Sequence, residues 1–131
     1  MQNASLPQRT LLYVEDNVAN MSLLRQLIAR RSDLKLLTAV DGQSGIMLAR
    51  AYQPAVILMD INLPGISGID ALNILRAGPS TSHIPVIALS SNAFPIDIKR
   101  GIDAGFFRYL TKPYKISYLL NALDEALSAV E

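Results

Sequence analysis

The sequence predicts a doubly wound α/β domain in which helices cover both faces of a five-stranded parallel sheet. Three observations lead to this fold class. Short continuous apolar runs recur along the chain, amphipathic stretches of helical period separate them, and turn-forming pairs such as Pro64-Gly65 stand between the two. Strands and helices that alternate in this way form parallel sheets with right-handed crossovers. The length of 131 residues fits one such domain.

Five segments are expected to form the strands. Their apolar runs are largely uninterrupted, which is typical of parallel strands covered on both faces. The segments are 11–14, 34–39, 55–59, 86–89 and 107–110. The second and fifth are the weakest, and Lys35 in the second predicts a strand at the edge of the sheet.

Five further segments are expected to form helices, because apolar residues recur in them at helical spacing. They are 18–31, 43–52, 67–77, 96–104 and 116–130. The last carries the clearest apolar stripe, and core packing is its expected role. Residues 1–9 precede the first element and are expected to form a flexible leader, so the domain itself is expected to span residues 10–131.

Composition narrows the classes of function. The 12 basic and 11 acidic residues give a net charge of +1, which disfavours direct binding to nucleic acid. The chain has no cysteine, which excludes disulfides and thiolate chemistry. It has neither a recognisable signal peptide nor an apolar stretch of about 20 residues, so no membrane insertion is expected. A cytoplasmic protein fits these features.

Charged and hydroxyl side chains stand where four of the expected strands end. Glu15 and Asp16 follow the first strand, Asp60 the third, Ser90 the fourth and Lys112 the fifth. Each has an ordinary structural alternative, since an aspartate can cap a helix, a serine can form a turn and a lysine can be a surface cation. Because the carboxyl ends of parallel strands meet at one rim, where such folds bind ligands, a joint functional site is the stronger interpretation.

The chemistry of this group points to phosphoryl transfer. Three carboxylates without a cation would repel one another, and a hard divalent cation such as Mg²⁺ removes that repulsion while keeping positions for further oxygen ligands. A carboxylate can be the nucleophile and form an aspartyl phosphate. Lys112 and the hydroxyl of Ser90 would then bind the phosphoryl oxygens and balance their charge.

Four segments resemble the receiver domains of bacterial response regulators, the CheY-like phosphoacceptors of two-component signalling. They are Leu12-Tyr13-Val14-Glu15-Asp16-Asn17, Leu58-Met59-Asp60-Ile61-Asn62-Leu63-Pro64-Gly65, Ile87-Ala88-Leu89-Ser90-Ser91-Asn92-Ala93 and Tyr109-Leu110-Thr111-Lys112-Pro113. The resemblance runs from about residue 11 to residue 127 and implies a flavodoxin-like sheet with strand order 2-1-3-4-5. The first and last segments are most similar to receivers of hybrid sensor histidine kinases, although a stand-alone regulator also fits.

The resemblance implies a role for each matching residue around the metal. Asp60 would be the phosphoacceptor. Glu15, Asp16 and Asp60 would bind Mg²⁺ together with the backbone carbonyl of Asn62. The side chains of Asn62 and Asn92 stand at the positions that tune dephosphorylation in the family.

The resemblance also implies a switch. Ser90 would move toward the phosphoryl group, Tyr109 would swing inward with it, and Lys112 would bind the phosphate. The Lys112-Pro113 bond resembles one that is usually cis in the family. The added negative charge would shift the balance between two packings and change the face formed by segments 96–104, 107–110 and 116–130.

The implied partners are a histidine kinase or phosphotransfer domain as phosphodonor and a downstream protein or domain at that face. The same face could serve a homodimer. The domain would be a signalling phosphoacceptor that assists its own phosphorylation and dephosphorylation, alone or within a hybrid kinase, rather than an enzyme with a separate substrate.

Two other interpretations stay open. A degenerate receiver would be a phosphate-independent binding module, but it would be expected to lack an acidic ligand or the lysine, and this chain has them all. A small phosphatase with an aspartate nucleophile needs a second acid for the leaving group, usually an aspartate two residues later, where this chain has Asn62.

Three details complete the comparison with the family pattern. Ser90 replaces the commoner threonine, and either hydroxyl can donate the bond. Segment 106–108 before Tyr109 is unusually apolar, for which packing is preferred to an exposed contact patch. His83, in a loop before the fourth strand, is assigned no role.

Overall fold

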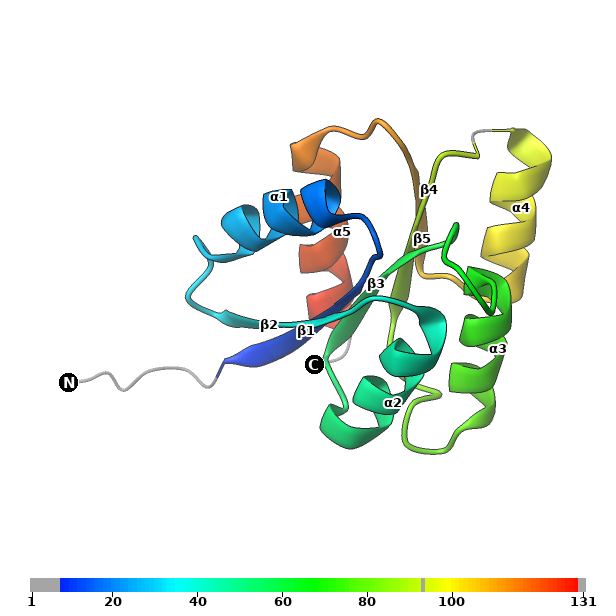
Figure 1. Cartoon of the computed structure of the whole chain (residues 1–131), viewed down its shortest axis with the longest axis horizontal. Coiled ribbons are helices and arrows are strands. Elements are labelled where there is room, and N and C mark those ends of the chain that lie inside the picture. Colours follow the sequence, from blue (N-terminus) through cyan, green and yellow to red (C-terminus); the bar gives the residue numbers. More distant parts are fainter. Residues whose placement is uncertain (1–7, 93, 130–131) are drawn as a thin grey trace.

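The chain folds around one parallel sheet, shown in Figure 1 as a computed structural model that describes residues 8–92 and 94–129. Within these residues five strands lie in the order β2-β1-β3-β4-β5, which confirms the predicted order. The strands are β1 (Arg9–Val14), β2 (Leu34–Ala39), β3 (Val56–Asp60), β4 (Val86–Ser90) and β5 (Arg108–Thr111). Lys35 lies in the edge strand β2, as expected. Residues 1–7 of the expected leader lie outside the described residues.

Each strand is followed by a helix, as the alternating pattern predicts. In the described part of the chain the helices are α1 (Val18–Ile28), α2 (Gly42–Tyr52), α3 (Gly68–Ala77), α4 (Pro95–Ala104) and α5 (Ile116–Ala129). Polar side chains fix the starts of three of them. Asn17, Asp41 and Ser67 each accept a hydrogen bond from a backbone N–H of the first turn of the helix they precede.

Helix α1 ends at Ile28 and not at the predicted residue 31. The chain turns here, with the amide of Arg31 donating to the carbonyl of Ile28 at 2.8 Å. The guanidinium of Arg31 then binds Asp33 through two hydrogen bonds of 2.9 Å. Residues 29–31, which were predicted to end the helix, therefore belong to the turn that leads into β2.

Helices cover both faces of the sheet, and the strands alternate between two cores. Figure 1 shows α1 and α5 on one side and α2 and α3 on the other. In β1, Leu11 and Tyr13 belong to the core under α1 and α5, whereas Leu12 and Val14 belong to the core under α2 and α3. This alternation follows from the period of two along a strand, and it explains why both neighbouring positions are apolar.

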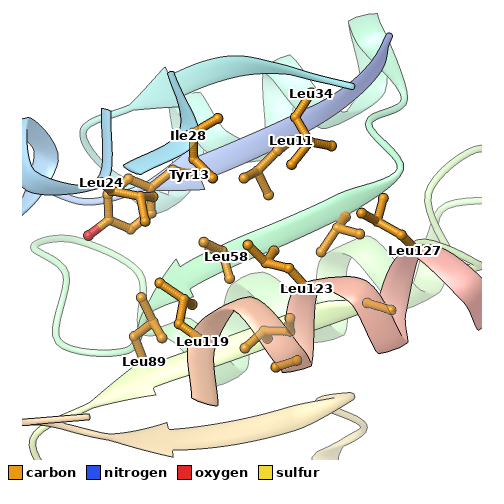
Figure 2. Close-up of a cluster of buried hydrophobic side chains, with 14 residues drawn as sticks. Leu11, Tyr13, Leu24, Ile28, Leu34, Leu58, Leu89, Leu119, Leu123 and Leu127 are labelled. Carbon is orange, nitrogen blue, oxygen red and sulfur yellow. The ribbon is translucent and has the colours of Figure 1, made fainter. Parts of the chain in front are cut away.

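The core under α1 and α5 is built around leucines (Figure 2). Leu58 of β3 and Leu119 and Leu123 of α5 are fully buried in it. Burial of each such side chain contributes roughly 1.5–3 kcal/mol to the folded state. The apolar stripe predicted for the last helix is therefore a packing stripe, as expected.

Helix α4 is less firmly packed than the other helices. Of its described residues only Gly101 is buried, while Ile96 and Ile102 are exposed. In the part of the chain that is described, each helix is too short or too polar to cross a bilayer.

Candidate functional site

Three carboxylates converge at the rim where β1 and β3 end. Glu15 and Asp16 directly follow β1, and Asp60 is the last residue of β3. The parallel register places Val14 beside Met59, which brings the residues after them together. One carboxylate oxygen from each of Glu15, Asp16 and Asp60 lies within 4.8 Å of the others. The predicted acidic cluster is thus present.

Glu15 is buried, as is Asp60, and hydrogen bonds hold its carboxylate. Its Oε1 accepts hydrogen bonds from the hydroxyl of Tyr13 at 3.0 Å and from Nδ2 of Asn20 at 3.3 Å. Its Oε2 accepts from the backbone N–H of Asn17 at 3.1 Å. Burial, and then the neighbouring carboxyl of Asp60, raise the pKa of Glu15 above its usual value.

Asp16 has the opposite environment. It is exposed, and the cap of α1 is Asn17, so the carboxylate of Asp16 is not used to cap the helix. The structural alternative for Asp16 therefore does not apply. Its side chain lies at the open side of the cluster, where an ion from solvent can reach it.

Lys112 supplies the positive charge opposite Asp60. Its Nζ lies 3.0 Å from Oδ2 of Asp60 and 3.8 Å from Oε1 of Glu15. Burial alone would lower the pKa of Lys112, but the hydrogen bond and the charge of Asp60 outweigh it, so the pKa lies above its usual value. The other oxygen of Asp60, Oδ1, accepts from the backbone N–H of Asn62 at 2.8 Å.

The donor set fits a hard divalent cation. Three carboxylates face one ammonium group, which leaves excess negative charge at a partly buried place. Mg²⁺ prefers oxygen ligands and usually keeps several waters, so a site of two or three carboxylates at an open rim suits it. The chain has no cysteine, so it offers no thiolate ligand.

The hydroxyl of Ser90 stands at the next strand end. Ser90 is fully buried, and its Oγ accepts from the backbone N–H of Asn92 at 2.9 Å. The next residue, Ser91, donates from its hydroxyl to Oδ1 of Asn62 at 3.3 Å. Asn62 and Asn92, both expected to tune dephosphorylation, are exposed beside the cluster.

Tyr109 connects this loop to α4. Its hydroxyl donates to the backbone carbonyl of Asn92 at 3.4 Å. Its ring lies against Gly101 so closely that a Cβ built on Gly101 would stand 2.7 Å from Cε2 of the ring. Ser90, Asn92, Tyr109 and Gly101 therefore form a continuous path of contacts from the site to α4.

The remaining expectations near β5 agree with the structure. The Lys112-Pro113 bond is cis. Phe106 is 3% exposed in one core and Phe107 packs against the other, so segment 106–108 is mainly packing. His83 is exposed and lies away from the contacts described above.

Sequence reasoning missed the residues that support the site. The hydroxyl of Tyr13 was counted only as part of an apolar strand, although its position two residues before Glu15 places both side chains on the same side of β1. Asn17 caps α1 and donates its backbone N–H to Glu15, while Asn20, in the first turn of the helix, reaches back to Glu15 with its side-chain amide. The contact of Gly101 with Tyr109 could not be identified from the sequence, since a glycine within a helix has many explanations.

Comparison with known proteins agrees with this geometry. The family model described as response regulator receiver domain matches residues 11–124. The polar-differentiation response regulator DivK of Brucella anthropi is 34% identical over 119 residues, which cover 91% of this chain and 96% of that protein.

Solved structures agree as well. The receiver domain of the sensor histidine kinase PA1611 from Pseudomonas aeruginosa, with a magnesium ion coordinated in its active-site cleft, is 30% identical with a TM-score of 0.83, covering 92% of this chain and 98% of that one. The Francisella response regulator 1452 receiver domain has a TM-score of 0.86 at 24% identity, covering 95% and 100%, and shows the shared fold. The chain belongs to the response regulator receiver domains of two-component signalling.

Proposed function

We propose that this domain accepts a phosphoryl group on Asp60 from a phosphohistidine in a Mg²⁺-dependent reaction and thereby changes its α4-β5-α5 face. The observation that carries the proposal is the position of the Lys112 ammonium, 3.0 Å from Asp60 within a cluster of three carboxylates. A lysine alone would neutralise one carboxylate. The excess of acids at the rim is the arrangement that a metal-assisted phosphoacceptor needs.

In the proposed reaction a carboxylate oxygen of Asp60 attacks the phosphorus atom. A bond forms between that oxygen and phosphorus while the bond from phosphorus to the histidine nitrogen breaks, and its electron pair stays on the imidazole of the donor. Asp60 is held for this step by the amide of Asn62 at 2.8 Å. Lys112 exchanges its bond with Asp60 for one to a phosphoryl oxygen, so its charge stays near the reacting atoms.

Glu15, Asp16, Asp60 and the backbone carbonyl of Asn62 would hold the Mg²⁺. When bound, the ion would neutralise negative charge that develops on the phosphoryl oxygens. Within this set, the open position of Asp16 favours direct contact with a metal. Glu15 already accepts three hydrogen bonds, two at Oε1 and one at Oε2, which leaves an acceptor position on Oε2 for the metal or for a water bound to it.

The signal is proposed to pass through the contact path from Ser90 to Gly101. A phosphoryl group on Asp60 offers a new acceptor to the hydroxyl of Ser90. Turning of that hydroxyl would release the amide of Asn92, which now donates to it, and Asn92 also accepts the bond from Tyr109. Because α4 is weakly packed, a small change at Tyr109 can shift its position.

The lifetime of the phosphorylated state is proposed to depend on Asn62 and Asn92. Both side chains are exposed at the mouth of the site, where water must pass to reach the phosphorus atom. The bond from Ser91 to Asn62 joins the two loops that flank this entrance.

The proposed phosphodonor is a histidine kinase or phosphotransfer domain in the cytoplasm. A cleft of about 390 Å³ adjoins Lys112, with Leu23 of α1 and Ile116 of α5 in its wall. Leu23 is half exposed, so an apolar face of the donor could pack there beside Asp60. The α4-β5-α5 face would then serve the downstream partner or a second copy of the chain.

The test is intact mass after incubation with acetyl phosphate, with and without Mg²⁺. We expect the mass of one phosphoryl group to be added only when Mg²⁺ is present, and not at all in Asp60→Asn. Asp124→Asn is the matched control, because this exposed acid pairs with Arg31 at the other end of the sheet. Addition of phosphate to Asp60→Asn would refute the assignment of the acceptor. Absence of addition to the wild type would instead favour a degenerate, phosphate-independent binding module, which the complete set of site residues does not favour.

A further inference from the structure

Tyr13 joins the hydrophobic core to the site through a single side chain. Its ring lies in the core under α1 and α5, and Figure 2 shows the hydroxyl oxygen at the margin of that cluster. The residue is 1% exposed, so its hydroxyl has little access to solvent and needs a partner inside the protein. That partner is Oε1 of Glu15, at 3.0 Å.

The strand geometry brings the two side chains to the same side of β1. Residues two apart along a strand point to the same side, and the amide of Glu15 still donates to the carbonyl of Ala39 at 2.9 Å, so the extended pairing continues past the end of β1. Tyr13 and Glu15 therefore lie next to each other below α1. The position of the ring is set by core packing, and the ring in turn sets the position of the hydroxyl.

The carboxylate of Glu15 is held at both oxygens. The amide of Asn17 binds Oε2, while Tyr13 and Asn20 bind Oε1. A competitor stands close by, since Nζ of Lys112 is 3.8 Å from the same Oε1. Without the bond from Tyr13, Oε1 would keep only the longer bond from Asn20 at 3.3 Å, and Lys112 would compete for the vacated acceptor position and be drawn away from Asp60.

We propose that Tyr13 is a positioning residue that holds the carboxylate of Glu15 in the orientation required for Mg²⁺ binding at the rim. Side chains that hydrogen-bond to metal-binding groups fix their orientation, and loss of such a partner typically weakens metal affinity by about 10- to 100-fold. The alternative is a core aromatic residue whose hydroxyl has merely found an acceptor. The two differ in whether removal of the hydroxyl changes metal binding.

The experiment compares Tyr13→Phe with the wild type in the full chain. Phe keeps the ring in the core and removes only the donor. Mg²⁺ alone, without phosphodonor, is titrated and followed by backbone amide chemical shifts at the strand ends. We expect the dissociation constant for Mg²⁺ to rise about tenfold in Tyr13→Phe. Tyr52→Phe, which removes a hydroxyl from an exposed residue of α2, should leave it unchanged.

A double-mutant cycle separates positioning from a general loss of stability. In a Glu15→Gln background, Tyr13→Phe should change the dissociation constant by less than about twofold, because the carboxylate it positions is gone. Urea unfolding of the metal-free proteins measures separately how far each substitution lowers the free energy of unfolding. Wild-type affinity in Tyr13→Phe, or an equal loss in both backgrounds, would overturn the inference.

The inference rests on the proposed metal site but not on phosphoryl transfer, and the outcomes are distinguishable. A wild-type protein that binds Mg²⁺ and takes no phosphate would refute the proposed function and leave the role of Tyr13 intact. A wild-type protein that takes phosphate, together with a Tyr13→Phe variant of unchanged Mg²⁺ affinity, would refute the role of Tyr13 alone. Failure of the wild type to bind millimolar Mg²⁺ would refute both.

Discussion

Substitution of Gly101 by alanine tests the contact between α4 and Tyr109. Gly101 lies within α4, where alanine would ordinarily stabilise the helix by about 1 kcal/mol. Here the new Cβ would stand 2.7 Å from Cε2 of Tyr109, which is closer than carbon atoms can approach. Overpacking of this kind typically costs about 1–3 kcal/mol. The net change in the free energy of unfolding is therefore expected to be a loss of up to about 2 kcal/mol.

The sign should reverse once the ring is removed. In a Tyr109→Ala background the added methyl keeps only an ordinary contact with Phe106, whose Cδ2 lies 3.6 Å away, so Gly101→Ala should raise the free energy of unfolding by about 1 kcal/mol through helix propensity. The difference between the two backgrounds is a coupling energy of about 1–3 kcal/mol, which is within the range found for residues in contact. Arg100→Ala, on the exposed side of the same helix, should show no such dependence.

The assay is urea unfolding of the four proteins of the cycle. Far-UV circular dichroism is the suitable probe, because the chain has no tryptophan. Equal effects of Gly101→Ala with and without Tyr109, within about 0.5 kcal/mol, would refute the reasoning. They would mean that α4 moves aside at no cost, and that the ring of Tyr109 does not restrain it.

Two further predictions concern the opposite end of the sheet. Arg76→Met removes the donors to the carbonyls of Ile84 at 2.8 Å and Gly105 at 3.3 Å, and should lower the free energy of unfolding by about 1–3 kcal/mol. Urea unfolding measures this free energy, and a loss no larger than the loss in Arg50→Met, which changes an exposed arginine, would contradict the prediction. The hydrogen bonds from Arg31 hold the pKa of Asp33 below its usual value. The stability this pair contributes is therefore present above about pH 4, the ordinary pKa, and is lost as the pH falls through the lower pKa of the folded state. Asp33→Asn should make the loss of the free energy of unfolding at acid pH smaller, by less than about 1 kcal/mol because Asp33 is 45% exposed. Urea unfolding at a series of pH values from 5 downward measures this, and the same pH dependence in the variant and the wild type would contradict the prediction.

Much of the fold and the outline of the site could be predicted from sequence. Continuous apolar runs identify strands buried on both faces, and alternation with helices implies parallel strands whose carboxyl ends share a rim. This reasoning is enough to bring Asp60, Ser90 and Lys112 together. It rests on local periodicity and chain topology, which a single sequence expresses directly.

Element ends were predicted less well. Helix α1 ends at Ile28 because Arg31 binds Asp33 across the turn that leads into β2. This ion pair replaces a further turn of helix only because the chain has to enter β2 at this point. β5 extends over Arg108–Thr111 and not over 107–110, because its register is set by pairing with β4, where Ser90 lies beside Thr111. Both element ends depend on contacts with other residues, and the periodicity of apolar residues does not reveal those contacts.

The sequence by itself determined which chemical groups stand at the strand ends and therefore what class of reaction they can support. Only the tertiary structure decided how those groups are supported. The burial of Glu15, its bond from Tyr13 and the contact of Gly101 with Tyr109 depend on how core packing sets each side chain. Periodicity tells which face a residue is on, but a hydrogen bond needs atoms placed within a few tenths of an ångström, and that precision comes from the packing of elements distant in sequence.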